Sequence, residues 1–104
     1  MIRTLDPLQA NALISEGRLD VVDVRGPREW SDGHIPNARL VPIEELKADP
    51  RSVLPRDGVV FVCARGVRSL VAAKLAEAAG WRELYSVDGG TVGWAGAGLP
   101  LVHG

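Results

Sequence analysis

Residues 58–80 read GVVFVCARGVRSLVAAKLAEAAG, and the type of fold follows from this stretch. The apolar run GVVFVC at 58–63 shows no alternation, which predicts a strand whose two faces are both covered by helices. The run SLVAAKLAEAAG at 69–80, rich in Ala and Leu and closed by a glycine, predicts a largely buried helix. A buried strand that leads directly into a helix indicates a parallel α/β sheet.

The flanking sequence continues this alternation of strands and helices. Asp6, Pro7 and Gln9 form a capping-box pattern, which predicts a helix over residues 7–15. Turn residues and apolar runs then predict strands over 19–25, 38–43 and 83–87 and short helical turns over 27–33, 43–47 and 91–98. The segment ADPRS at 48–52 is expected to end the helical turn at 43–47. We therefore expect one α/β domain over residues 1–104, a small three-layer domain with a central parallel sheet flanked by helices.

The composition excludes several classes of function. Lys and Arg number 12 against 13 Asp and Glu, and a net charge of −1 gives no strong positive field for nucleic acid. No apolar run approaches the roughly 20 residues of a membrane-spanning helix, and the first residues, MIRTLDPLQA, lack the layout of a secretory signal. We expect a cytoplasmic monomer that binds neither nucleic acid nor a membrane.

The chain has one cysteine, Cys63, so no internal disulfide can form. The two histidines, His34 and His103, are far apart in the sequence and show no zinc-type spacing with the cysteine. We therefore expect no metal ion and no cofactor.

The position of Cys63 makes it the candidate nucleophile. It ends the strand at 58–63, and ligands of open parallel sheets bind at the carboxyl ends of the strands. The loop after it leads into a helix, so backbone N–H groups can point at the sulfur and favour the thiolate without an adjacent base. The predicted site consists of the catalytic Cys63 and an anion-binding loop, namely Ala64, Arg65, Gly66, Val67, Arg68 and Ser69.

A structural role for Cys63 is the alternative, because a lone cysteine at the end of an apolar strand is more often a small buried apolar residue. The residues after it favour reactivity. Gly66 lets the loop turn its amides inward, Arg65 and Arg68 supply positive charge, and Ser69 is expected to open the helix. The sequence leaves open which arginine faces the sulfur.

Other conspicuous residues have structural expectations. Asp23 and Arg25 lie on the same side of their strand and are expected to tie loops together near the edge of the sheet. His34 is expected to be a hydrogen-bonded loop residue. Trp30 and Trp94 are expected to pack in the core. Gly89 and Gly90 are expected to let the chain pass close beside the cysteine loop.

Three segments, in order along the chain, resemble the rhodanese-like (sulfurtransferase) domain family. VVDVRGPREWSDGHIPNA at 21–38 is similar to the family's Asp-x-Arg, Glu-aromatic and Gly-His-Ile-Pro-x-Ala motifs. VCARGVRS at 62–69 is similar to its cysteine loop, and VDGGTVGWAGAGLPL at 87–101 to its closing Gly-Gly, Trp and Gly-x-Pro motifs. The resemblance covers nearly the whole chain.

The resemblance implies a rhodanese-like fold and a sulfurtransferase. Cys63 would take a sulfane sulfur from a small-molecule donor such as thiosulfate, hold it as a covalent persulfide, and pass it to a thiophilic acceptor, which is cyanide in vitro. Arg65 and Arg68 would help to bind an anionic donor. A protein sulfur acceptor is a further possible partner.

Two rival functions remain open at this stage. Dual-specificity phosphatases and arsenate reductases share the fold but have five residues between Cys and Arg, whereas four separate Cys63 from Arg68. One residue fewer removes up to about 3.5 Å of loop, which favours a pocket for sulfur over one for phosphate and predicts negligible aryl-phosphate hydrolysis.

The second rival is a non-enzymatic or partner-dependent module, either a sulfur carrier or a regulatory domain. Inactive members of the family typically lack the cysteine, which is present here.

Overall fold

The computed structural model describes residues 1–104 and contains a five-stranded sheet with the strand order β1-β5-β4-β2-β3. Every pairing in the sheet is parallel. The strands are β1 (Ile2–Leu5), β2 (Asp20–Asp23), β3 (Arg39–Leu40), β4 (Val59–Val62) and β5 (Leu84–Val87). The helices are α1 (Pro7–Ser15), α2 (Pro27–Ser31), α3 (Ile43–Ala48), α4 (Pro50–Val53), α5 (Val67–Ala78) and α6 (Gly90–Gly96).

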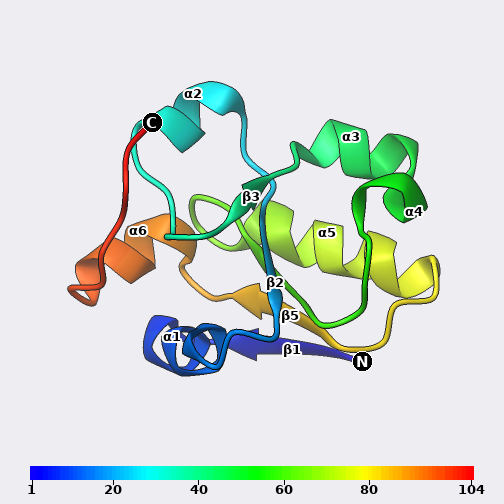
Figure 1. Cartoon of the computed structure of the whole chain (residues 1–104), viewed down its shortest axis with the longest axis horizontal. Coiled ribbons are helices and arrows are strands. Elements are labelled where there is room, and N and C mark those ends of the chain that lie inside the picture. Colours follow the sequence, from blue (N-terminus) through cyan, green and yellow to red (C-terminus); the bar gives the residue numbers. More distant parts are fainter.

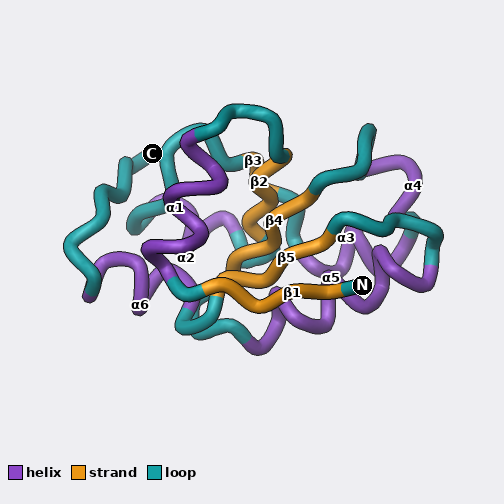
Figure 2. Tube along the Cα trace, turned by 90° about the horizontal axis from the view of Figure 1, so that it is seen from below, coloured by secondary structure: helices purple, strands orange, loops and turns teal.

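The strands run through the middle of the molecule with helices to either side (Figures 1 and 2). Successive strand residues point to opposite faces of a sheet, and β4 shows this clearly. Val59 and Phe61 pack with α3 and α5 in one apolar cluster, whereas Val60 and Val62 pack with α1 and α6 in the other. All four residues of β4 are fully buried. The predicted three-layer α/β fold with a parallel sheet is confirmed.

Local signals explain where the first helix begins. The Gln9 N–H donates to Asp6 Oδ1 at 2.8 Å, and the Asp6 N–H donates to Gln9 Oε1 at 3.0 Å. This reciprocal pair satisfies two backbone donors that a helix start would otherwise leave free. The predicted helix over residues 7–15 is confirmed with the same bounds. No helix in the structure combines the length and the apolar character needed to cross a bilayer.

Several sequence expectations need correction. Residues 2–5 form an edge strand, β1, that the sequence analysis did not identify, and its partner β5 supplies the backbone pairing. The strand expected over 38–43 is only two residues long. The segment expected only to break the chain after 43–47 carries a helical turn of its own, α4, which starts at Pro50. The helix expected over 69–80 begins two residues earlier and is not largely buried, since only one of its faces packs on the sheet.

The topology fixes where a site can form. In a parallel sheet the carboxyl ends of all strands lie at one edge, and α1, α5 and α6 each begin at that edge, directly after β1, β4 and β5. In Figure 1 this edge faces α2 and α6, and the two helices α5 and α6 start beside each other there. Cys63 follows the last residue of β4 and therefore lies at this edge.

Candidate active site

The loop that follows Cys63 folds back around its sulfur. The Gly66 N–H points at Cys63 Sγ with the nitrogen at 3.1 Å, and the Ser69 N–H does the same at 3.3 Å. The Ser69 hydroxyl lies 3.5 Å from the sulfur. Gly66 adopts a φ of +99°, which side chains rarely permit, and this turn brings the amides inward. Two backbone amides and one hydroxyl group thus converge on one sulfur atom, a cradle suited to an anion.

The cradle sets the acidity of the thiol. Cys63 is 1% exposed, and burial by itself raises the pKa of its thiol. Hydrogen bonds from the Ser69 hydroxyl and from the backbone amides of Ser69, Arg65 and Gly66 act in the opposite direction and outweigh burial. The pKa of Cys63 therefore lies below that of an ordinary cysteine, as expected for a nucleophilic thiol.

Ser69 has a different role from the one expected. The N-cap of α5 is Gly66, and Ser69 lies inside the first turn of the helix instead of opening it. Its hydroxyl is fully buried and lies 2.8 Å from the hydroxyl of Ser86 on β5. Ser69 therefore links the sulfur of Cys63 to a second buried hydroxyl, one that the sequence analysis did not identify.

The two arginines of the loop differ in their surroundings. Arg65 is exposed. Arg68 forms a bidentate pair with Glu29 of α2, with Nη1–Oε1 and Nη2–Oε2 distances of 2.9 and 2.8 Å. The Glu29 carboxylate raises the pKa of Arg68, and the nearby Cys63 adds to this effect. Arg68 is thus held by an ion pair with α2 that neutralises part of its charge, whereas Arg65 lies at the surface.

Glu29 joins α2 to the cysteine loop. It also accepts a hydrogen bond from the Gly26 N–H at 3.3 Å, at the start of α2. The hydrogen bond from Arg68 is the largest cause that lowers the pKa of Glu29, to about 2, against a smaller opposing effect of burial. Glu29 remains ionised at neutral pH and holds the Arg68 guanidinium in place.

A buried ion pair braces the loops at this edge. Arg25 Nε and Nη2 donate to the Asp23 carboxylate at 2.8–3.1 Å, and Nη2 also donates to the Gly33 carbonyl at 2.7 Å. The Thr91 hydroxyl lies 3.4 Å from Arg25 Nη1. Asp23 is fully buried and Arg25 is 5% exposed. The pair connects β2, the segment after α2 and the start of α6, which is the structural role that the sequence predicts for it.

The start of α6 packs directly against the cysteine loop. The Thr91 N–H donates to the Cys63 carbonyl at 2.8 Å, and the Val92 N–H donates to the Ala64 carbonyl at 3.1 Å. A Cβ atom on Gly90 would overlap the Cys63 carbonyl oxygen and the Ala64 carbonyl carbon. The absence of a side chain at this position is therefore what allows the close chain passage predicted for the Gly-Gly pair.

The remaining conspicuous residues lie around this centre. Trp94 is 1% exposed and belongs to the core, as predicted, and its indole N–H donates to the Pro100 carbonyl at 2.8 Å. Trp30 is only half-buried and stacks on the His34 ring at 3.5 Å between centroids, so its predicted place in the core is wrong. His34 Nδ1 lies 2.9 Å from the Trp30 carbonyl oxygen, which confirms the expected hydrogen-bonded loop residue.

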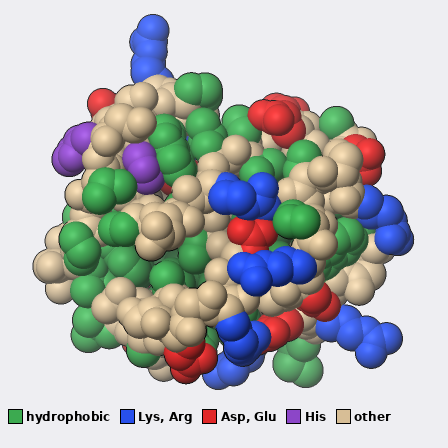
Figure 3. All heavy atoms as spheres, in the orientation of Figure 1, with side chains coloured by type: hydrophobic (Ala, Val, Ile, Leu, Met, Phe, Trp, Pro, Cys, Tyr) green, Lys and Arg blue, Asp and Glu red, His purple; other side chains and the backbone are tan.

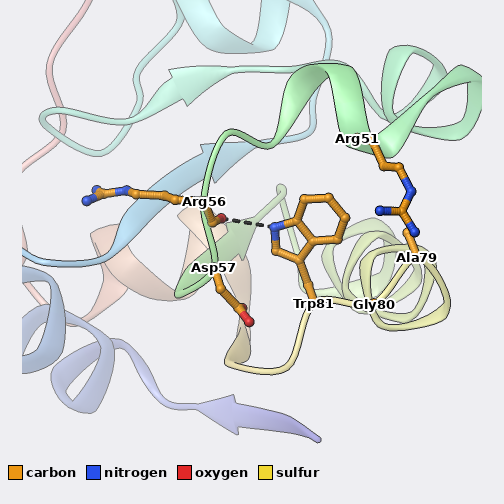
Figure 4. A pocket seen from close by; sticks show the side chains of 6 residues that line it. All are labelled: Arg51, Arg56, Asp57, Ala79, Gly80 and Trp81. Atoms are coloured by element: carbon orange, nitrogen blue, oxygen red, sulfur yellow. Dashed lines mark hydrogen bonds between the residues drawn. The ribbon is translucent and has the colours of Figure 1, made fainter.

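A pocket of about 310 Å³ lies at the opposite edge of the sheet, where Asp57 precedes β4 and Trp81 follows α5 (Figure 4). The Trp81 indole N–H donates to the Arg56 carbonyl at 3.0 Å, and the Arg51 guanidinium lies 5.8 Å from the centre of its ring. In Figure 4 the Arg56 side chain points away from the indole. This pocket contains no residue of the cysteine loop and is separate from the site around Cys63.

Comparison with known proteins decides the family. The sequence model of the rhodanese-like domain matches residues 6–97, which include the strands β4 and β5 and the helices α2, α5 and α6 around Cys63. The chain belongs to the rhodanese-like domain family. A rhodanese-related protein of Thermoplasma volcanium has the same fold, with a TM-score of 0.85, 32% identity, and coverage of 96% of this chain and 97% of that one.

Two relatives named as sulfurtransferases differ in how much of their length this chain matches. A sulfurtransferase of Allochromatium vinosum is 35% identical over 83 residues, which cover 79% of this chain and 77% of that protein. A probable adenylyltransferase/sulfurtransferase, MoeZ, of Mycobacterium tuberculosis is 35% identical over 95 residues, which cover 88% of this chain. This match covers only 24% of MoeZ, so this relative carries other regions that the present chain does not match.

The sequence analysis missed three residues that contact the predicted loop or brace the site. Glu29 had a visible signal, because an acidic residue three positions after Gly26 and just behind Pro27 fits a helix start. Nothing in the sequence indicated that Glu29 would pair with Arg68, which lies 39 residues away. Ser86 and Thr91 likewise reach the site only through the folding of β5 and α6 against the loop.

Proposed function

We propose that this rhodanese-like domain is a sulfurtransferase that carries sulfur as a persulfide on Cys63. The observation that carries the proposal is the convergence of the Gly66 and Ser69 amides and the Ser69 hydroxyl on the cysteine sulfur. The names of the relatives from Allochromatium and Mycobacterium support a role in sulfur transfer. Donors aimed at an anionic sulfur stabilise both the resting thiolate and the terminal sulfur of a persulfide.

The proposed reaction has two displacement steps. In the first, the Cys63 thiolate attacks the outer sulfur of a donor such as thiosulfate, a new S–S bond forms, and the S–S bond of thiosulfate breaks with its electron pair leaving on sulfite. In the second, a thiophilic acceptor such as cyanide attacks the outer sulfur of the persulfide. A C–S bond forms, the S–S bond breaks, and the electron pair returns to Cys63 as thiolate. No external oxidant or reductant is needed.

The loop arginines support an anionic donor in this scheme. Thiosulfate carries two negative charges, and the exposed Arg65 and the half-exposed Arg68 lie on the same loop as the nucleophile. Since Glu29 holds Arg68, Arg65 is the cation free to meet the donor first. Charge at a site mouth raises the local concentration of an oppositely charged substrate.

The proposal is tested by recording the intact mass after incubation with thiosulfate, and then adding cyanide and measuring thiocyanate. We expect a gain of one sulfur atom, its loss on addition of cyanide, and one thiocyanate released for each sulfur lost. Cys63→Ser is the control and should gain nothing. If the wild-type protein gains no sulfur on Cys63, the proposed mechanism is wrong.

A protein acceptor in place of a small molecule is the second candidate, and the exposed apolar residues around the loop favour it. Val67, in the first turn of α5, is 73% exposed, and Val92, whose N–H binds the loop, is 53% exposed. In the space-filling view, hydrophobic side chains dominate the left of the visible face, over α6 and α1, while charged side chains gather toward the right (Figure 3). Exposed apolar residues grouped at a reactive group are typical of protein contact surfaces.

The two candidates differ in the second step. A persulfide that forms readily with thiosulfate but turns over slowly with cyanide would indicate a protein acceptor. Rapid release of thiocyanate would indicate that the site serves small molecules unaided. Val67→Ser and Val92→Ser should leave the cyanide reaction unchanged in both cases, because neither side chain contributes a donor to the sulfur.

A further inference from the structure

Beneath the cysteine, two hydroxyl groups continue the hydrogen bonding into the core. Ser86 Oγ on β5 lies 2.8 Å from Ser69 Oγ, which in turn lies 3.5 Å from Cys63 Sγ. All three residues are at most 1% exposed. Ser69 is the only hydrogen-bond partner of the Ser86 hydroxyl. The hydroxyl of this serine, on a central strand among apolar residues, therefore bonds only to a residue that contacts the sulfur.

The number of protons in this chain of groups depends on the state of Cys63. With a thiol there are three protons, on Ser86, Ser69 and the sulfur, but only two contacts between the three groups. One buried donor is then left without an acceptor, whichever way the chain of hydrogen bonds runs. With a thiolate there are two protons for two contacts. Ser86 donates to Ser69, and Ser69 donates to the sulfur.

This difference favours the anionic sulfur, because a buried donor without an acceptor is costly. A hydroxyl proton can also rotate, and Ser69 alone could turn its proton away from the sulfur. A proton from Ser86 fills the acceptor side of Ser69 Oγ and leaves the Ser69 proton facing Cys63. The geometry therefore gives Ser86 an effect on a sulfur atom that it does not touch.

We infer that Ser86 is a positioning residue of this site, which donates to Ser69 and thereby directs the Ser69 hydroxyl proton to the sulfur of Cys63. The inference concerns the same sulfur as the proposed sulfur transfer, and it extends that proposal. Its test uses the resting protein without a sulfur donor, so the two can fail separately.

A change at Ser86 should leave the charged groups near the sulfur in place. They are Arg68 of α5 with its partner Glu29 of α2, and the pair formed by Asp23 at the end of β2 and Arg25 two residues later. None of these four side chains bonds to Ser86. A change in the titration of Cys63 in a Ser86 variant would therefore report the hydroxyl chain.

The experiment is a pH titration of the ultraviolet absorbance of the thiolate, which the single cysteine makes specific. Burial and the Glu83 carboxylate raise the pKa of Tyr85, the only tyrosine, which keeps its signal clear of the thiolate. We expect Ser86→Ala to move the midpoint of the Cys63 titration upward by about one pH unit, the size of one lost buried hydrogen bond. Ser86→Thr keeps the hydroxyl and should stay near the wild-type midpoint.

Two comparisons decide whether Ser86 acts through Ser69. Leu84→Val, on the same face of β5 two residues earlier, alters core packing to a similar extent and should leave the midpoint unchanged. In a Ser69→Ala background, Ser86→Ala should cause no further shift, since the intermediate hydroxyl is gone. An unchanged midpoint in Ser86→Ala, or an equal shift in both backgrounds, would overturn the inference.

Discussion

Replacement of Gly90 by alanine should push the cysteine loop away from α6. The residue adopts a φ of +59°, and a Cβ atom there would lie 2.5 Å from the Ala64 carbonyl oxygen while overlapping the Cys63 carbonyl oxygen. Nonbonded carbon atoms pack at about 3.5–4.0 Å. All the atoms that it would meet belong to the backbone, so no side chain can rotate out of the way.

The size of the effect follows from two contributions. The left-handed backbone conformation costs a residue other than glycine about 1–2 kcal/mol. Separation of the loop from α6 also breaks the hydrogen bonds from Thr91 and Val92 to the Cys63 and Ala64 carbonyls, which contribute about 0.5–1.5 kcal/mol each. We expect the free energy of unfolding to fall by about 2–5 kcal/mol, and Tm by at least about 8 °C.

Thermal unfolding followed by circular dichroism measures this loss of stability. The rate of thiocyanate formation from thiosulfate and cyanide should also fall, because the displaced loop no longer holds its donors against the sulfur of Cys63. Gly96→Ala is the matched control, because this glycine lies on the same helix with nothing within 4 Å of its Cβ position and no left-handed φ. It should leave Tm unchanged or raise it slightly. A Tm of Gly90→Ala within about 2 °C of the wild type would refute the steric argument, since the two contributions predict far more.

Two further predictions concern the ion pairs of the site. Glu29→Gln should lower the free energy of unfolding by less than about 1 kcal/mol at pH 7, because both partners are about two-fifths exposed. Since Arg68 lowers the pKa of Glu29 to about 2, the wild-type advantage should be complete above about pH 4.5 and disappear as the pH falls toward 2; an advantage that grows on acidification would contradict the pairing. Asp23→Asn leaves the buried Arg25 guanidinium without a counter-charge and should cost about 3–5 kcal/mol in urea unfolding. A loss below about 1 kcal/mol would show that the Gly33 carbonyl alone satisfies Arg25.

The sequence predicted those elements whose signals are local. The capping box at Asp6 gave α1 its bounds, and the unbroken apolar run before Cys63 gave the central strand. The sequence did not predict β1, because a four-residue edge strand that is exposed along most of its length carries no strong hydrophobic pattern. Its backbone pairing comes from β5, some 80 residues later in the chain.

The candidate site divides in the same way. The thiol, the glycine of the loop and the nearby arginines lie within six residues of sequence. The spacing from Cys63 to Arg68 therefore favoured sulfur chemistry over phosphate chemistry, in a chain that resembles the rhodanese-like family. The interactions of each group could not be predicted from the sequence. Whether an arginine is free or paired, and whether a serine caps a helix or touches a sulfur, depends on which distant residue the fold brings beside it.

Three features can be inferred from the amino-acid sequence alone: the parallel α/β sheet, the place of Cys63 at its carboxyl edge and the composition of the cysteine loop. Each of these follows from hydrophobic pattern and backbone preference within a short stretch of chain. Only the tertiary structure assigned Glu29 to Arg68, Ser86 to Ser69 and Gly90 to the back of the loop. These contacts join α2, β5 and α6 to one loop, and hydrogen bonds act over about 3 Å, so they exist only once the elements have packed.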